Sequence, residues 1–108
     1  PISRAPARLC AIHAIELYLN AFLLATGDPP ERIRAHFHNL AERAERAVER
    51  GLVLRKLTLA HLAKMTEARE YLISRYGPEL STTLSESNRL MATLNEIARK
   101  IRPVVAVR

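Results

Sequence analysis

The side chains best suited to metal or nucleophilic chemistry are four histidines, at positions 13, 36, 38 and 61, and one cysteine, Cys10. No HExxH pairing joins the histidines, and His36 and His38 would point about 200° apart on one helix. A single cysteine excludes a disulfide framework, and the apolar run beside Cys10 indicates a small core residue rather than a nucleophile. Three glycines leave little for a phosphate-binding loop. We therefore expect no metal site and no cofactor.

Glu16 is the single charged residue in the otherwise apolar stretch 9–27. A buried carboxylate must either bind a proton or pair with a cation, because leaving it alone in an apolar interior is costly. The expected partners are Arg69 or Arg75 in the third helix, or Arg89 in the fourth. Two interpretations stay open: an ion pair that fixes the register of the helices, or part of a polar pocket in the core.

The elements that must position these residues are helices, because the chain is rich in Ala, Leu, Glu and Arg. The first expected helix spans 5–25 and ends before Gly27, a typical C-terminal cap. It is apolar on nearly every side, which predicts a position between partner helices. The same stretch resembles a membrane span or signal sequence, but Glu16, His13 and Asn20 interrupt it. We therefore expect a core helix and no membrane.

Three further helices are expected after the first. The second begins at Asp28, which with Glu31 forms a capping box, and the stretch 35–39 can divide it so that Asn39 starts a second piece. Its solvated face is expected to hold Glu42, Arg43, Glu45, Arg46, Glu49 and Arg50, with Glu42 and Arg46 paired. The third runs over 58–76 and stops at Gly77-Pro78. The fourth runs over 85–101 with Met91 on its inner face, and Pro103 ends it.

These elements predict an all-α fold: one domain over 1–108, an antiparallel up-and-down bundle of four or five helices, with 103–108 as a C-terminal tail. The apolar first helix needs more cover than three helices give, so we predict a homodimer that uses the first or the last helix. The net charge of +6, with 14 Arg among 17 basic residues, favours a nucleotide or RNA as partner. The lone cysteine favours a reducing compartment, the cytoplasm.

Three segments resemble HEPN domains, the higher eukaryote and prokaryote nucleotide-binding domains. Residues 11–27, AIHAIELYLNAFLLATG, are similar to the opening helix of that family. His38-Asn39-Leu40 is similar to its His-Asp-Leu motif, and 70–78 to the Arg-Tyr-Pro ending of its third helix. Asn20 and Asn39 stand where the family usually has Lys and Asp, so a charge is missing at each position.

The resemblance implies a bundle that often dimerises, with one of two activities. Some HEPN domains are metal-independent ribonucleases that use an Arg followed four to six residues later by a His. Here Arg55 and His61 are the best-placed such pair, with His61 as general acid or base and Arg55 stabilising phosphate charge. A chain so rich in Arg gives roughly one or two matches at random, so the pair is a weak catalytic candidate.

Other HEPN domains are non-catalytic and bind nucleotide or substrate, often beside nucleotidyltransferases in toxin–antitoxin-like pairs. We expect this second type: a module, not an enzyme, that binds a nucleotide, an anionic ligand or a protein partner such as a nucleotidyltransferase. The expected binding residues are Arg34, His38, Asn39, Arg69, Arg75, Tyr76 and Glu16. A ribonuclease and a purely structural dimerisation module remain the alternatives.

Overall fold

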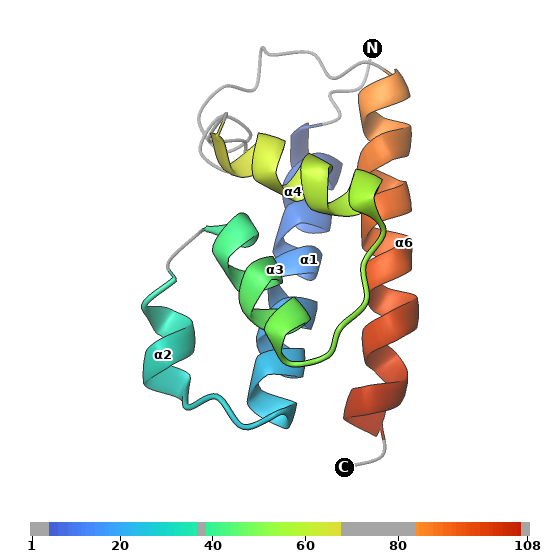
Figure 1. The fold of residues 1–108 in the computed structure, drawn as a ribbon. Coiled ribbons are helices and arrows are strands. Elements are labelled where there is room, and N and C mark those ends of the chain that lie inside the picture. Colours follow the sequence, from blue (N-terminus) through green and yellow to red (C-terminus); the bar gives the residue numbers. More distant parts are fainter. Residues whose placement is uncertain (1–4, 37–38, 68–83, 107–108) are drawn as a thin grey trace.

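The computed structural model describes residues 5–36, 39–67 and 84–106, which form helices and connecting turns without a strand (Figure 1). The predicted all-α class is therefore confirmed for the described part of the chain. The helices are α1 (Ala5–Ala25), α2 (Pro30–Arg34), α3 (Leu40–Glu49), α4 (Lys56–Glu67) and α6 (Leu84–Ala106).

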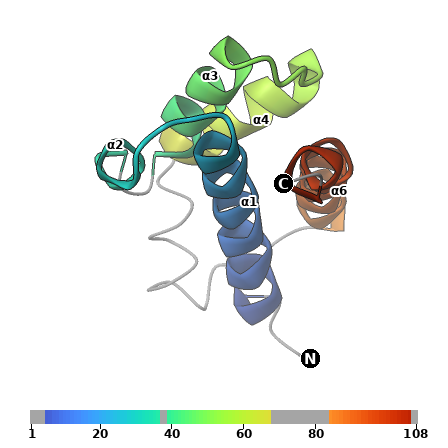
Figure 2. The ribbon, with the colours of Figure 1, turned by 90° about the horizontal axis from the view of Figure 1, so that it is seen from below.

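The long helices α1 and α6 lie side by side and run in the same direction, while α4 crosses in front of them (Figures 1 and 2). α3 packs against both α1 and α4, and α4 also contacts α6. The antiparallel up-and-down order that the sequence predicts is not confirmed, since the two longest helices are parallel neighbours.

α1 ends as the sequence predicts. Gly27 has φ of +107°, a conformation that costs little only for glycine. The amide of Gly27 donates to the carbonyl of Leu24 at 3.1 Å, and that of Asp28 to Leu23 at 2.9 Å. These two bonds form a Schellman motif, which turns the chain from α1 towards α2.

α1 is covered on one side and open on the other. Four of its side chains, Ile12, Ile15, Leu19 and Leu23, have no exposed surface. On the opposite side Leu17 is 65% exposed and Cys10 is also exposed, so the prediction of a core position for Cys10 is wrong. The physical reason is helical phase, since Cys10 and Leu17 lie seven residues apart on the face turned away from the core. Within the described part of the chain, Pro6–Ala25 is the one stretch long and apolar enough to cross a membrane, a property shared by core helices and signal sequences.

The second predicted helix is divided, as expected, into α2 and α3. Asn39 is the N-cap of α3, and its side-chain oxygen accepts the amide of Glu42 at 2.9 Å. The predicted capping box is wrong: Pro29 precedes α2, and no side chain caps it. Asp28 is instead buried, 3% exposed.

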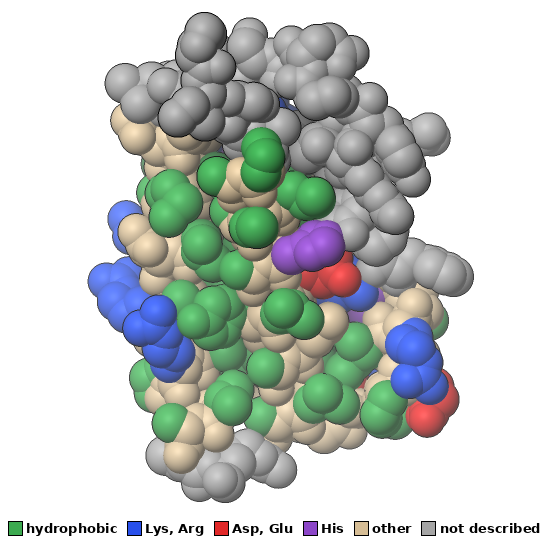
Figure 3. Space-filling model, turned by 180° about the vertical axis from the view of Figure 1, so that it is seen from behind, with side chains coloured by type: hydrophobic (Ala, Val, Ile, Leu, Met, Phe, Trp, Pro, Cys, Tyr) green, Lys and Arg blue, Asp and Glu red, His purple; other side chains and the backbone are tan. Residues whose placement is uncertain are grey.

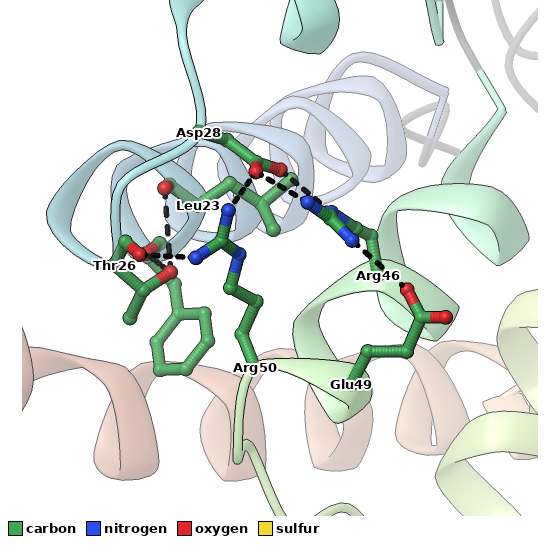
Figure 4. Close-up of polar contacts among 7 residues, drawn as sticks. Leu23, Thr26, Asp28, Arg46, Glu49 and Arg50 are labelled. Atoms are coloured by element: carbon green, nitrogen blue, oxygen red, sulfur yellow. Dashed lines mark hydrogen bonds and ion pairs between the residues drawn. The ribbon is translucent and has the colours of Figure 1, made fainter.

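Asp28 binds two guanidinium groups, those of Arg46 in α3 and of Arg50, the C-cap of that helix (Figure 4). Arg46 donates to both carboxylate oxygens, at 3.0 and 2.9 Å, and Arg50 donates to Asp28 and to the carbonyl oxygen of Thr26. The hydrogen bond from Arg46 outweighs burial and, with Arg50, lowers the pKa of Asp28 to about 2. Arg46 and Arg50 are therefore half-buried structural cations rather than members of a solvated face, and Arg46 pairs with Asp28 and Glu49 rather than with Glu42.

Glu96 is a second buried carboxylate, and its hydrogen bonds join the start of α4 to α6. It is 2% exposed, and it accepts hydrogen bonds from the amide of Arg55 at 2.8 Å, from the hydroxyl of Thr58 and from Nζ of Lys100 at 2.8 Å. Burial alone would raise the pKa of Glu96, but these donors outweigh it and lower the pKa to about 2. Lys100 also donates to the carbonyl oxygen of Val53 at 2.7 Å, which holds the loop before α4.

The end of α6 differs from the prediction. The helix continues through Pro103 to Ala106, so 103–106 are not a tail. A proline so close to a helix end removes one backbone hydrogen bond, and Val104 packs against the core, which offsets that loss. Met91 is 48% exposed rather than on the inner face. Leu90, Ile97 and Ile101 form the buried side of α6 instead.

Replacing Asp28 with Asn removes the buried carboxylate that Arg46 and Arg50 share, and leaves the exposed Glu49 as the remaining acidic partner of Arg46. A pKa lowered from 3.8 to about 2 corresponds to roughly 2–3 kcal/mol. We expect Asp28→Asn to lower the free energy of unfolding at pH 7 by about that amount, measured by urea denaturation. Glu49→Gln is the control, since Glu49 also pairs with Arg46 but is 67% exposed, and it should change stability little.

The lowered pKa of Asp28 also predicts that the stability of the fold depends on pH. A carboxyl group with a lower pKa in the folded state stabilises the fold above its unfolded pKa, and this stability is lost as the pH falls from about 4 through about 2. The wild type should therefore lose more stability than Asp28→Asn over this window. Glu96 titrates in the same window in both proteins, so the difference between them isolates Asp28. Equal slopes would contradict the role given to Asp28.

Candidate functional site

Of the seven binding residues that the sequence predicts, His38, Arg69, Arg75 and Tyr76 lie outside the described residues. The other three are not brought together by any contact among the described residues. Arg34 is an exposed residue of α2, and its Nη2 lies 3.9 Å from Oε1 of Glu31. Asn39 uses its side-chain oxygen to cap α3. Glu16 lies on α1.

Glu16 faces Arg43 of α3, which the sequence placed on a solvated face. Arg43 is 3% exposed, and its Nη2 lies 3.9 Å from Oε2 of Glu16. Nε of Arg43 donates to Oδ1 of Asn20 at 2.7 Å. Glu16 and Asn20 are one turn apart on α1, so together they form a polar notch that receives the guanidinium group. Among the described residues Glu16 pairs with Arg43 and not with Arg89 of α6, whereas the other two expected partners, Arg69 and Arg75, lie outside the described residues.

The groups around Arg43 compensate only part of the cost of burying its positive charge. Burial lowers the pKa of Arg43, and the charges of Glu16 and Glu42 oppose that shift. Nη1 of Arg43 is buried and has no hydrogen-bond partner. Glu42 is held by His36, whose Nδ1 lies 2.5 Å from Oε1 of Glu42. This arrangement serves to join α1 to α3.

The weak catalytic pair, Arg55 and His61, is held by different residues of α6. Nε of Arg55 lies 3.4 Å from Oε1 of Glu96, while Nδ1 of His61 is 2.7 Å from the hydroxyl oxygen of Thr93. Arg55 is therefore committed to a buried carboxylate. The positive charges that act on His61 come from other residues, namely Arg8, Lys64 and Arg89.

The charges of three cations from three helices act on His61. Lys64 lies one turn after His61 on α4, and Arg89 lies one turn before Thr93 on α6, so the hydrogen bond between His61 and Thr93 brings both towards one spot. Arg8 of α1 adds a third positive charge that acts on His61. We call Arg8, His61, Lys64 and Arg89 the His61 cluster.

Lys64 and Arg89 of the His61 cluster have no acidic partner among the described residues. No ion pair joins either residue to an acidic side chain in the described part of the chain, and Nε of Arg89 is buried without a hydrogen-bond partner. Burial and the charges of Arg89, Lys64 and Arg8 lower the pKa of His61 to about 4. At pH 7 the imidazole is therefore neutral and lies beside positive side chains, which is an environment suited to an anion.

The sequence contained a weak signal for this cluster. The spacing of His61 and Lys64, and that of Arg89 and Thr93, can be read from the chain, but nothing local shows that α4 crosses α6 at these residues. Arg89 was considered only as a partner for Glu16. Among the described residues, no group of three or more His, Cys, Asp or Glu could hold a metal ion.

Comparison of the chain with models of protein families, with curated proteins and with solved structures gives no match. The resemblance to HEPN domains therefore stays a prediction.

The His61 cluster predicts an unusual titration. We expect the ring protons of His61 to titrate with a midpoint near 4 in an NMR experiment. Arg89→Gln removes a neighbouring positive charge and should raise the pKa of His61. Arg99→Gln makes the same change at an exposed position of α6 and should leave it unaltered. A midpoint near 6.5 in the wild type would show that the cations do not meet at His61.

Proposed function

We propose that this chain is a non-catalytic helical module that binds a phosphate-bearing anion at the His61 cluster. The observation that supports the proposal is that Lys64 and Arg89, each one turn from the hydrogen-bonded pair His61 and Thr93, both act on His61 by their charge and have no acidic partner among the described residues. Cations held close together without a counter-charge repel one another, and a bound phosphate group relieves that repulsion.

Arg89 gives the cluster a directional donor. Its side chain is half-buried, and the buried Nε is not used by any hydrogen bond. A buried donor without an acceptor is costly, so a ligand oxygen that approaches it gains more than one that meets a solvated cation. Lys64 is exposed and supplies charge without fixed direction.

The protonation state of His61 favours binding over cleavage. With a pKa of about 4, the ring is neutral at pH 7, which disfavours the role of the acid that protonates a leaving group. Its Nδ1 is also engaged with Thr93. These facts support a binding module rather than the alternative of a metal-independent ribonuclease.

The resemblance to HEPN domains indicates which anions to test first. Non-catalytic members of that family bind nucleotides, so mono-, di- and triphosphate nucleotides with inorganic pyrophosphate form a suitable panel. On the same resemblance, a nucleotidyltransferase is the proposed protein partner, and the cytoplasm the proposed location.

We expect one or more compounds of this panel to raise the melting temperature, since a ligand at a hundredfold excess over its dissociation constant stabilises a protein by about 2.7 kcal/mol. Lys64→Gln and Arg89→Gln should each weaken binding by about tenfold, because each removes a charged contact. Isothermal titration calorimetry measures the change. Rising salt should also weaken binding.

Each variant has a matched control on the same helix. Lys56→Gln and Arg99→Gln remove the same charges from exposed positions of α4 and α6 that do not face His61, and they should bind as the wild type does. If all four variants weakened binding equally, the net charge rather than the cluster would attract the anion. If no compound shifted the melting temperature, the proposal would fall in favour of a purely structural module.

A further inference from the structure

Apolar side chains form a stripe along the open side of α1. They follow a spacing of four and three residues, at Cys10, Ala14, Leu17, Ala21 and Leu24. Leu17 is 65% and Leu24 48% exposed, and Cys10 is exposed as well. Side chains at this spacing share one side of a helix, so the stripe is continuous over about 21 Å.

The edge of α6 widens the stripe into a face. Glu96 points to the loop and helix in front, so by helical phase Met91, Ala98 and Val105 lie on the opposite side of α6. Met91 is 48% and Val105 39% exposed. In Figure 2, α3 and α4 lie on one side of α1 and α6, and Figure 3 shows hydrophobic side chains gathered on the other side. We call the stripe together with Met91 and Val105 the rear face.

Basic side chains lie at both edges of the rear face (Figure 3). On α6, residues 97–106 hold three bases and no acid. One of these bases is Arg102, which is exposed, and its Nε donates to the hydroxyl oxygen of Tyr18 on α1 at 3.2 Å. At the other edge, α2 carries the exposed Arg32 and Arg34, with the single acid Glu31. The rear face is therefore apolar at its centre and positively charged at its rim.

The area and charge of the rear face decide which partner fits it. Two neighbouring helices give a width of about 20 Å, so the face measures about 420 Å². A second copy of the chain would bury about 840 Å² in total, which is less than the roughly 1,200 Å² of small specific interfaces. It would also bring together two chains that each carry a net charge of +6. A lipid bilayer needs neither a minimum area nor a matching shape, and an anionic bilayer attracts the basic rim.

We propose that the rear face binds the surface of an anionic phospholipid membrane. Leu17, Leu24 and Met91 enter the boundary between headgroups and acyl chains, and Arg102 reaches the lipid phosphates. An arginine can do so at the rim because its aliphatic part lies along apolar groups while its guanidinium group donates to phosphate oxygens. The covered side of α1 stays in the core, so this contact differs from the membrane span that the sequence argues against.

Co-sedimentation with vesicles tests the proposal. The full chain should bind vesicles of phosphatidylserine and phosphatidylcholine in equal parts, and bind phosphatidylcholine alone far more weakly. Leu17→Gln should lower the partition coefficient roughly ten- to hundredfold, the effect of leaving one leucine out of the apolar phase. Leu57→Gln is the matched control, since Leu57 of α4 is 68% exposed but lies off the rear face, and it should bind as the wild type does. Circular dichroism checks that both variants keep their helices.

A second pair of variants tests the basic rim. Arg102→Gln should lower the partition coefficient about fivefold, because it removes one positive charge at an anionic surface. Arg102→Lys keeps the charge and should restore binding, which separates the charge from the hydrogen bond to Tyr18. Lys56→Gln removes the same charge from α4, a full helix layer and more than a Debye length away from the lipid, and should have little effect.

The native Cys10 reports directly on the contact, since it is the single cysteine of the chain and lies on the rear face. An environment-sensitive fluorophore attached to Cys10 should shift its emission to the blue when anionic vesicles are added. The same fluorophore at position 57, in Cys10→Ala with Leu57→Cys, should keep its emission in water. A blue shift at position 57 and not at Cys10 would place the lipid on another side of the molecule.

Further outcomes would overturn the proposal. These are a failure to bind anionic vesicles and equal binding to phosphatidylcholine alone. A loss of vesicle binding in Arg89→Gln but not in Leu17→Gln would place the lipid phosphate at the His61 cluster. A dimer that Leu17→Gln breaks, without vesicle binding, would assign the rear face to a second copy. The test is independent of the proposed function, because nucleotides can fail to bind while vesicle binding through Leu17 remains.

Discussion

The buried carboxylate of Glu96 determines where α4 lies. It accepts the first amide at the start of α4 and the hydroxyl of Thr58, and it binds Lys100, which holds the preceding loop. A carboxylate with so many donors cannot leave the interior without exposing all of them, so α4 is fixed across α6. His61 reaches Thr93 only because of that crossing. The cationic cluster is therefore a consequence of an anion buried one turn further along α6.

The same solution recurs at the other end of the molecule. Asp28 lies just after α1 and is neutralised by Arg46 of α3 and by Arg50, the C-cap of that helix. Arg43 of α3 lies in the notch beside Glu16. In each case a charged pair joins α3 or its C-terminal cap to α1 or the turn after it, beside the buried Leu40, Ala44 and Ala47 of α3. Such pairs specify which helices meet and in what register, while the free energy of folding comes chiefly from the apolar side of α1.

The helices were predictable because their signals are local. The end of α1 at Gly27 and the start of α3 at Asn39 depend on backbone conformation and on a side chain bonding its own helix. The roles of Asp28 and Arg43 were missed because each depends on a partner at least 18 residues away in the chain. Local rules assign an Asp before Pro-Pro to a cap, and an Arg among glutamates to the solvent. The exposure of Cys10 was missed because an evenly apolar helix does not reveal which side the fold covers.

The His61 cluster depends on the covered side of α1 as well as on the crossing of α4 and α6. By helical phase Arg8 points towards the covered side of α1, whereas Leu17 points away from it. The charge of Arg8 therefore acts on His61 from the side on which α1 packs against the other helices. Because His61 reaches Thr93 only where α4 crosses α6, charges that lie far apart in the sequence act on one imidazole only in the folded chain.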